Sequence, residues 1–123
     1  MADWAGGVDP VPRPVTFGGV RAMWVIAMFD LPVDTKEARR EYVRFRNALL
    51  DDAFIMLQFS VYGRPCPSEE NAQMHAGRVA AHVPPGGEVR ILTLTDLQYS
   101  RMKIFLGRRK KSPEEPPAQL SFF

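Results

Sequence analysis

One carboxylate stands at a point of the chain where it can do chemistry. Asp30 directly follows an apolar run, Ala22 to Phe29, and precedes Leu31-Pro32. Because proline cannot donate a ladder hydrogen bond, the strand predicted for this run ends here and Asp30 emerges toward a loop. A carboxylate in this position either binds a cation such as Mg²⁺ or caps the turn that follows, and the residues alone leave both roles open.

A catalytic role for Asp30 requires a second copy of the chain. Metal sites that cleave phosphodiesters use one or more carboxylates, and two-metal sites use several. A twofold dimer supplies the missing ligand, since an isologous interface brings the same residue of both subunits to the axis. The shortage of carboxylates therefore predicts that two Asp30 side chains share one hydrated Mg²⁺.

The other acids favour structural roles. Asp96 follows Thr93-Leu94-Thr95 and is interpreted as a turn former that could support the site. Asp51 and Asp52 are predicted at the carboxyl end of a helix, which the helix dipole makes unfavourable for a carboxylate pair, so a solvated loop is expected there.

Four further polar residues are also interpreted as structural. His75 and His82 are seven residues apart on one predicted helix edge, without a third ligand at fitting spacing, and are expected at the boundary of the core. Ser60 is expected to be a hydrogen-bonding strand residue. Cys66, between two prolines, is not expected to act as a nucleophile.

Positive charge gathers in two places, the first predicted helix and the run 108–111. Glu37 and Glu41 lie among the helix cations, so a face of i,i+4 ion pairs explains much of the pattern. Alternatively, the two groups form a ridge that follows a duplex backbone through its phosphates without reading bases. The helix cations are Lys36, Arg39, Arg40, Arg44 and Arg46.

Length and composition indicate one globular domain. The chain has 123 residues, 46% of them hydrophobic and 24% charged, which excludes wholesale disorder and collagen-like order. Residues 20–112 carry 15 of the 16 Lys and Arg but 10 of the 14 acids, so this part has a net charge of +5. One cysteine and two histidines exclude an internal disulfide and a Cys/His zinc site.

The distribution of apolar residues predicts a cytoplasmic protein without a membrane partner. The longest apolar run, 22–29, is far shorter than the roughly 20 residues that span a bilayer, and no secretion signal is visible.

Proline and glycine divide the chain into three parts. Residues 1–20 are predicted to be a flexible extension, and residues 21–111 a folded domain. Residues 112–123 form a Pro-rich tail that ends in an apolar segment, Leu120-Ser121-Phe122-Phe123.

Within the domain, strand and helix patterns alternate. The apolar run 22–29 predicts a buried strand, and Asp34 or Thr35 then caps a helix with an apolar stripe from Ala38 to Leu49. Residues 54–62 alternate as a strand, and Ser68 opens a second helix that Pro84 to Gly87 end. Val89–Thr95 predicts a further strand, and Met102–Leu106 a short last one.

This order predicts an α+β fold, a ferredoxin-like βαββαβ sandwich with two helices on one face of an antiparallel sheet. One stretch is difficult to fit. Residues 53–62 must supply two strands, although they contain no Gly, Asn or Pro turn, and 63–67 (GRPCP) is predicted to break the run.

Three segments together resemble a known family. Val25–Pro32, Phe54–Tyr62 and Val89–Asp96 (VIAMFDLP, FIMLQFSVY and VRILTLTD) are similar to the Cas-two (Cas2) family of CRISPR-associated proteins. The resemblance covers residues 22–107, and it is closest to members from type II-like systems that use a single large effector nuclease.

The resemblance implies a homodimer that is the central subunit of the spacer-acquisition complex, between two dimers of the CRISPR-associated integrase, the Cas-one protein. It further implies a prespacer DNA duplex bound by basic residues, a tail that grips the integrase, and a contact with the effector nuclease. The implied DNA-binding residues are Lys36, Arg39, Arg40, Arg108 and Arg109, and the implied docking residues are Leu120, Phe122 and Phe123.

The resemblance also implies a metal-dependent endonuclease of single-stranded RNA or double-stranded DNA, with Asp30 as catalytic residue and Mg²⁺ ligand. Whether the protein is an enzyme is left open between this activity and a non-enzymatic DNA-bridging scaffold, and the single acid per chain favours the scaffold. A small ligand-sensing module is a third hypothesis, and the lack of a Gly-rich or polar pocket motif argues against it.

Overall fold

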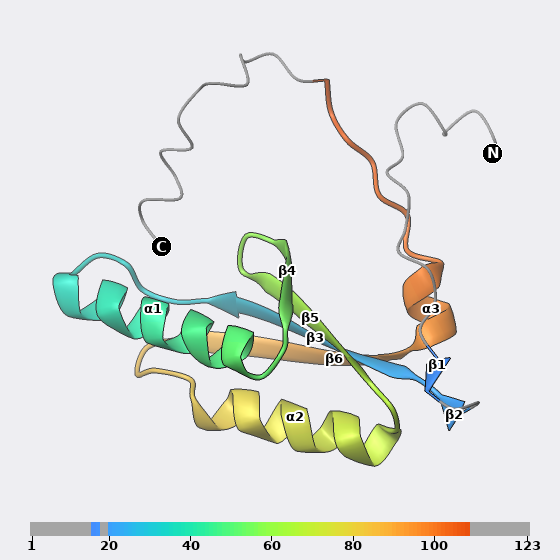
Figure 1. The fold of residues 1–123 in the computed structure, drawn as a ribbon. Helices are drawn as coiled ribbons and strands as arrows, with labels where there is room; N and C mark the ends of the chain where they lie inside the picture. Colours follow the sequence, from blue (N-terminus) through green and yellow to red (C-terminus); the bar gives the residue numbers. More distant parts are fainter. Residues whose placement is uncertain (1–15, 18–19, 109–123) are drawn as a thin grey trace.

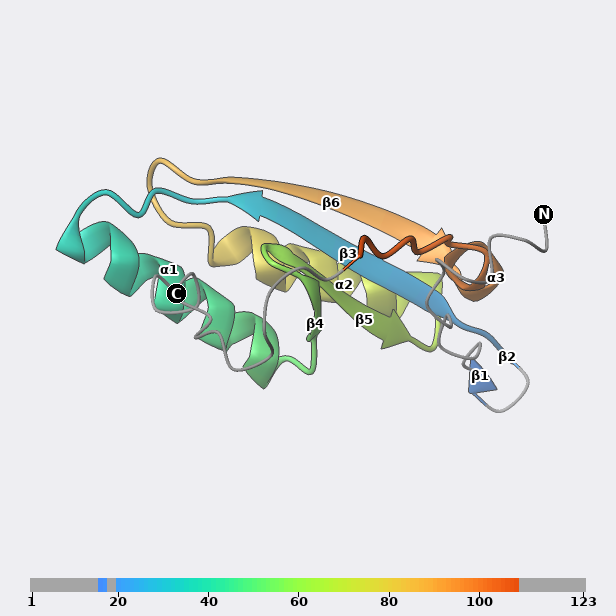
Figure 2. The same cartoon turned by 90° about the horizontal axis from the view of Figure 1, so that it is seen from above.

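The computed structural model describes residues 16–17 and 20–108, and they form the predicted ferredoxin-like fold (Figure 1). A four-stranded sheet has the order β4-β5-β3-β6, and every neighbouring pair in it is antiparallel. Figure 2 shows both long helices beneath one face of this sheet. The elements are β1 (Thr16–Phe17), β2 (Val20–Arg21), β3 (Met23–Asp30), α1 (Lys36–Asp51), β4 (Ile55–Gln58), β5 (Val61–Cys66), α2 (Glu69–Ala81), β6 (Glu88–Thr95) and α3 (Asp96–Ser100).

The central strand β3 is apolar on both sides because both sides are covered. Its odd-numbered residues, Val25 to Phe29, belong to the core under the helices, where Phe29 packs edge-on against Phe45 of α1 at 5.0 Å between ring centroids. Trp24 and Ile26 face the other side. The predicted strand is therefore confirmed, and Asp30 is its last residue.

The two long helices begin at side-chain caps. Thr35 rather than Asp34 caps α1, since its hydroxyl accepts a hydrogen bond from Ala38 N at 2.9 Å. Ser68 caps α2 in the same way, from Asn71 N. The predicted apolar stripe of α1 is confirmed, with Tyr42, Phe45 and Leu49 buried against the sheet.

The hairpin that lacked a turn signal is closed by Phe59 and Ser60. Ser60 has a φ of 64°, a left-handed conformation more often taken by glycine or asparagine. The β4–β5 ladder also shifts register between Met56 and Gln58. Residues 53–62 thus supply one complete strand and the beginning of the next.

The prediction that residues 63–67 break this run is wrong, because β5 continues to Cys66. A side chain on Gly63 would press against Leu57 and Ile26, at 3.0 and 3.1 Å, so glycine is used here for close packing. Pro65 lies beyond the end of β4, where one side of β5 has no neighbouring strand and proline is tolerated.

The predicted last strand, Met102–Leu106, is also wrong. Thr95 and Gln98 form a reciprocal capping box that starts α3 directly after β6, so the chain turns out of the sheet. Residues 102–108 are extended, with only an isolated bridge at Phe105, and in Figure 1 they rise from α3 away from the two long helices.

The sheet face opposite the helices has its own small core. Trp24 and Tyr99 stack with ring centroids 3.8 Å apart, and Trp24 Nε1 donates a hydrogen bond to Asp96 Oδ1 at 2.9 Å. Ile26 completes this core, but Leu92, opposite Ile26 in the register, remains 48% exposed. We call this side the open face of the sheet.

The ends of the chain are described only in part. Thr16–Phe17 pairs with Val20–Arg21 as a short antiparallel ladder across the boundary between the predicted extension and the predicted domain. The predicted tail 112–123, with Leu120, Phe122 and Phe123, lies outside the described residues, as does Arg109. No helix in the described part of the chain has the length and apolar character needed to cross a bilayer.

Candidate metal and nucleic-acid site

Asp30 is exposed at the carboxyl end of β3, as predicted. It lines an open hollow of about 330 Å³ together with Met28, Phe29, Glu88 and Arg90. Its register partner on β6 is Glu88, so two carboxylates from neighbouring strands end at one edge of the sheet. The carboxylate of Glu88 accepts a hydrogen bond from Arg90 at 2.7 Å.

Sequence reasoning missed Glu88 and Arg90. They are 58 and 60 residues from Asp30 in the chain, and only the β3–β6 register brings them beside it. No local motif encodes this register.

The donor atoms at this edge suit a hydrated Mg²⁺, which takes one or two carboxylates and keeps several waters. Within residues 16–17 and 20–108, no group of three His, Cys, Asp or Glu side chains could hold a metal ion. A single copy thus offers Asp30, and also Glu88 if it leaves Arg90. The sharing of a metal between two Asp30 residues stays a prediction.

The β4–β5 turn borders Asp30 on its other side. Phe29 N, one residue before Asp30, donates a hydrogen bond to Ser60 O at 3.0 Å. The hydroxyls of Ser60 and Tyr42 lie 3.2 Å apart, which connects the turn to α1. Ser60 is therefore a turn residue and not the strand residue that was predicted, because its positive φ takes it out of the ladder.

The predicted DNA-binding cations of α1 are exposed on the first turns of this helix. Lys36 and Arg40 have no ion pair within the described chain, and Arg39 Nη1 donates to the backbone oxygen of Val33 at 2.9 Å. The expected ladder of i,i+4 pairs is absent from the described side chains, since the only ion pair on α1 joins Arg44 to Glu41, three residues earlier, at 2.7 Å.

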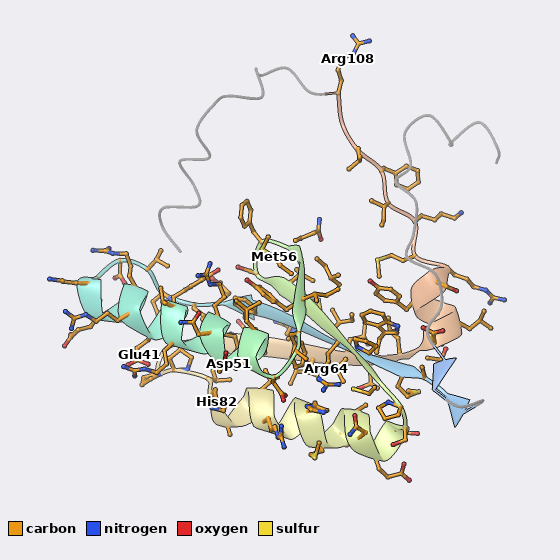
Figure 3. All side chains as sticks on the ribbon, viewed as in Figure 1. Glu41, Asp51, Met56, Arg64, His82 and Arg108 are labelled. Atoms are coloured by element: carbon orange, nitrogen blue, oxygen red, sulfur yellow. The ribbon has the colours of Figure 1, made fainter. Side chains whose placement is uncertain are left out.

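Of the second cation group the structure describes Arg108, which lies away from α1 within one chain (Figure 3). Arg108 is exposed at the last described position and stands at the far end of the segment that rises from α3 (Figure 3). The rest of the run, including Arg109, lies outside the described residues.

Asp51 is exposed as predicted, but it is the last residue of α1 and not part of a loop, and the prediction of a solvated carboxylate is wrong for Asp52. Asp52 accepts hydrogen bonds from His75 Nδ1 at 2.7 Å and Arg78 Nη1 at 2.8 Å. Burial alone would raise the pKa of Asp52, but the hydrogen bonds and charges of His75 and Arg78 outweigh it and lower the pKa. Folding brings α2 against the carboxyl end of α1. His75 and Arg78 of α2 then stabilise the Asp52 carboxylate, although the dipole of α1 disfavours a negative charge there.

The two histidines have different surroundings. His75 is buried, and His82 is exposed beside Asp51 at the hollow between α1 and α2 (Figure 3), where its Nδ1 donates to Arg78 O at 2.8 Å. Cys66 is buried, and this burial raises the pKa of its thiol against the opposing charge of Arg64, as expected for a thiol that is not a nucleophile.

Asp96 is more than a turn former. It is 5% exposed, and it accepts the indole hydrogen bond of Trp24 at the start of α3. A buried carboxylate needs such a donor, because desolvation without one is costly. Its place on the open face, away from Asp30, gives it no direct contact with the metal site.

Fold and site together define a small ferredoxin-like protein with a basic helix beside an exposed strand-end aspartate. The chain belongs to the family described as CRISPR associated protein Cas2, whose sequence model matches residues 23–102. The resemblance expected from the sequence is thereby confirmed, and the protein is CRISPR-associated.

Its relatives share most of their length with it. A protein of Parvibaculum lavamentivorans named CRISPR-associated endoribonuclease Cas2 is 54% identical over 82% of this chain and 100% of its own. Proteins with the same name from Flavobacterium psychrophilum and Paracidovorax avenae are 39% and 45% identical, over 84% and 85% of this chain and 90% and 97% of their own.

Proposed function

We propose that this chain acts in CRISPR adaptation as a homodimer that bridges two integrase dimers and binds the prespacer duplex through its phosphate backbone. The observation that supports this most directly is the exposed row of Lys36, Arg39 and Arg40, whose charges no acid within the described chain neutralises. Guanidinium and ammonium groups of this kind release counterions from DNA when they contact phosphates. The binding is therefore independent of base sequence.

The open face of the sheet is the surface through which two copies join. Leu92 and Ile55 are half exposed there, around the partly buried Leu94 and Leu57. Neighbouring apolar side chains of this kind mark an interaction surface. A second copy related by a twofold axis would cover them and double the cations.

The apolar end of the chain remains the predicted contact with the integrase, by strand addition of the segment that includes Leu120, Phe122 and Phe123. A contact with the effector nuclease and a cytoplasmic location likewise remain predictions.

The test is reconstitution of the complex from the purified full chain, its neighbouring integrase and a short duplex. A combined Lys36→Gln, Arg39→Gln, Arg40→Gln variant should dimerise and bind the integrase but lose duplex binding. Truncation after residue 112 should abolish assembly with the integrase and leave the homodimer intact. Unchanged duplex binding by the triple variant would contradict the proposed DNA interface.

The alternative function is a Mg²⁺-dependent endonuclease, and the exposure of Asp30 beside Glu88 favours it, as do the names of the relatives. Asp30 of both copies would hold the ion, and Glu88 lies close enough in the register to join them. Bound Mg²⁺ would supply a Lewis acid for the phosphate and a more acidic water. Arg90 would hold Glu88 in place and Lys36 would bind the flanking backbone.

Cleavage of single-stranded RNA and double-stranded DNA, with Mg²⁺ and with a chelator, tests this activity. Asp30→Ala should abolish any cleavage while duplex binding and integrase assembly persist. Asp34→Ala is the matched control, since Asp34 is an exposed acid four residues away, outside the hollow. Equal cleavage by the wild type and Asp30→Ala would rule out the aspartate as the catalytic residue.

A further inference from the structure

Arg46 of α1 has no hydrogen-bond acceptor within the described part of the chain, whereas two other arginines of the long helices each pair with an acid. Arg44 pairs with Glu41, and Arg78 pairs with Asp52. Within the described part of the chain, no hydrogen bond or ion pair involves Arg46, and its Nε is buried without a partner. A buried N–H group of a guanidinium that is left unsatisfied requires an explanation.

Arg46 belongs to the same side of α1 as the predicted DNA-binding Arg39. The two are seven residues apart, nearly two helical turns, so they project in nearly one direction about 10 Å apart along the axis. Arg44, by contrast, projects about 160° away from Arg46 around the helix. The positive charge on this side of α1 therefore extends beyond the first turns of the helix, where Arg39 lies, to Arg46.

Contacts of neighbouring residues show that Arg46 faces the β4–β5 hairpin. Tyr42, one turn earlier on α1, meets Ser60 of the hairpin turn. Burial raises the pKa of the Tyr62 hydroxyl on β5, and the positive charge of Arg46 acts in the opposite direction, so the guanidinium lies near that residue. Figure 2 shows α1 along the β4 side of the molecule, with α2 under the centre of the sheet.

We propose that Arg46 is a further phosphate-binding residue, which contacts the backbone of the bound duplex on the hairpin side of α1. The spacing from Arg39 equals the axial rise of about three nucleotides of one strand. Packing already restrains this guanidinium, so little side-chain entropy remains to be lost when a phosphate binds it. A phosphate would accept charged hydrogen bonds from the two Nη groups, which are not among the buried atoms and have no acceptor within the described part of the chain.

This inference rests on the proposed DNA binding and deepens it, and the first test compares two matched variants of the full chain. Affinity for a short fluorescent DNA duplex is measured across a salt series. Arg46→Gln should weaken binding roughly three- to tenfold and reduce the slope of log K against log salt by about one. Arg101→Gln, which changes an exposed arginine at the end of α3, should change neither quantity, and Arg46→Lys should keep the slope.

A second measurement needs no variant. The wild-type protein is treated with phenylglyoxal, which modifies arginine, with and without the duplex, and the modified sites are read by mass spectrometry. The duplex should protect Arg46 and leave Arg101 reactive.

The outcomes separate this inference from the function on which it rests. If the Lys36, Arg39, Arg40 triple variant loses duplex binding but Arg46→Gln behaves as Arg101→Gln does and the duplex leaves Arg46 unprotected, only the role of Arg46 is wrong. If the triple variant also binds normally, the DNA interface on α1 itself is wrong.

Discussion

The imidazole Nδ1 of His75 lies 2.7 Å from Oδ2 of Asp52, and this contact ties the end of α1 to α2. Arg64 of β5 joins the same point, since its Nε donates to the backbone oxygen of Asp52 at 2.7 Å. Asp52 therefore connects two helices and a strand. The side-chain exposures of His75 and Asp52 are 5% and 17%, so water competes little for these hydrogen bonds.

Asp52→Asn should destabilise the fold, because His75 and Arg78 would then donate hydrogen bonds to a neutral amide instead of a negatively charged carboxylate. Hydrogen bonds to a charged group contribute about 1.5–3 kcal/mol, and the free energy of unfolding in urea should fall by a value in this range. The matched control is Asp51→Asn, which changes an exposed neighbour and should alter stability by less than about 0.5 kcal/mol. Equal effects of the two substitutions would show that the contact does not stabilise the fold.

The same carboxylate predicts a loss of stability in acid. The pKa of Asp52 in the folded chain is below its ordinary value of 3.8, so the folded state binds this proton more weakly than the unfolded state does. The stabilisation of the fold by Asp52 is fully present above the pKa that this carboxyl has in the unfolded chain. It is lost as the pH falls through the pKa in the folded chain. In urea titrations from pH 6 to below pH 3, Asp52→Asn should lose less stability than the wild type, and parallel curves would contradict this.

The open face of the sheet should control the oligomeric state. Leu92→Glu places a charge where a second copy would cover an apolar side chain, so the dimer should dissociate to monomers in sedimentation or light scattering. Met74→Glu is the control, because Met74 is exposed to a similar extent but lies on α2. If Leu92→Glu stays dimeric, the two copies join through another surface.

Two glycines should respond in opposite directions to alanine. A Cβ on Gly87 would lie 2.5 Å from Cδ2 of the buried Leu31, and 3.2 Å from Pro84 O, so Gly87→Ala should destabilise by about 1–3 kcal/mol. A Cβ on Gly77 meets nothing within 4 Å inside α2, so Gly77→Ala should stabilise by about 0.4–1 kcal/mol. Thermal unfolding of both variants beside the wild type measures the contrast.

The elements with local sequence signals were predictable from the residues alone. An uninterrupted apolar run indicates a buried strand, and this run became β3. A side-chain hydroxyl before the first helical turn marks the start of α1 at Thr35 and of α2 at Ser68. Asp30 follows from the same local logic, since a proline two residues later ends the strand at its carboxylate. The three segments that resemble the Cas2 family are also short stretches of consecutive residues. For this reason both the fold and the family could be predicted.

Features that depend on strand register and on packing became visible only in the folded chain. Ser60 turns the hairpin in a left-handed conformation because the strands on either side are held in place by β3, and its type carries no such signal. The β3–β6 register puts Glu88 opposite Asp30, and the approach of α2 to α1 gives Asp52 its donors. These contacts join residues far apart in the chain, and their free energy exists only once the sheet and helices have packed, so no short pattern of residues could predict them.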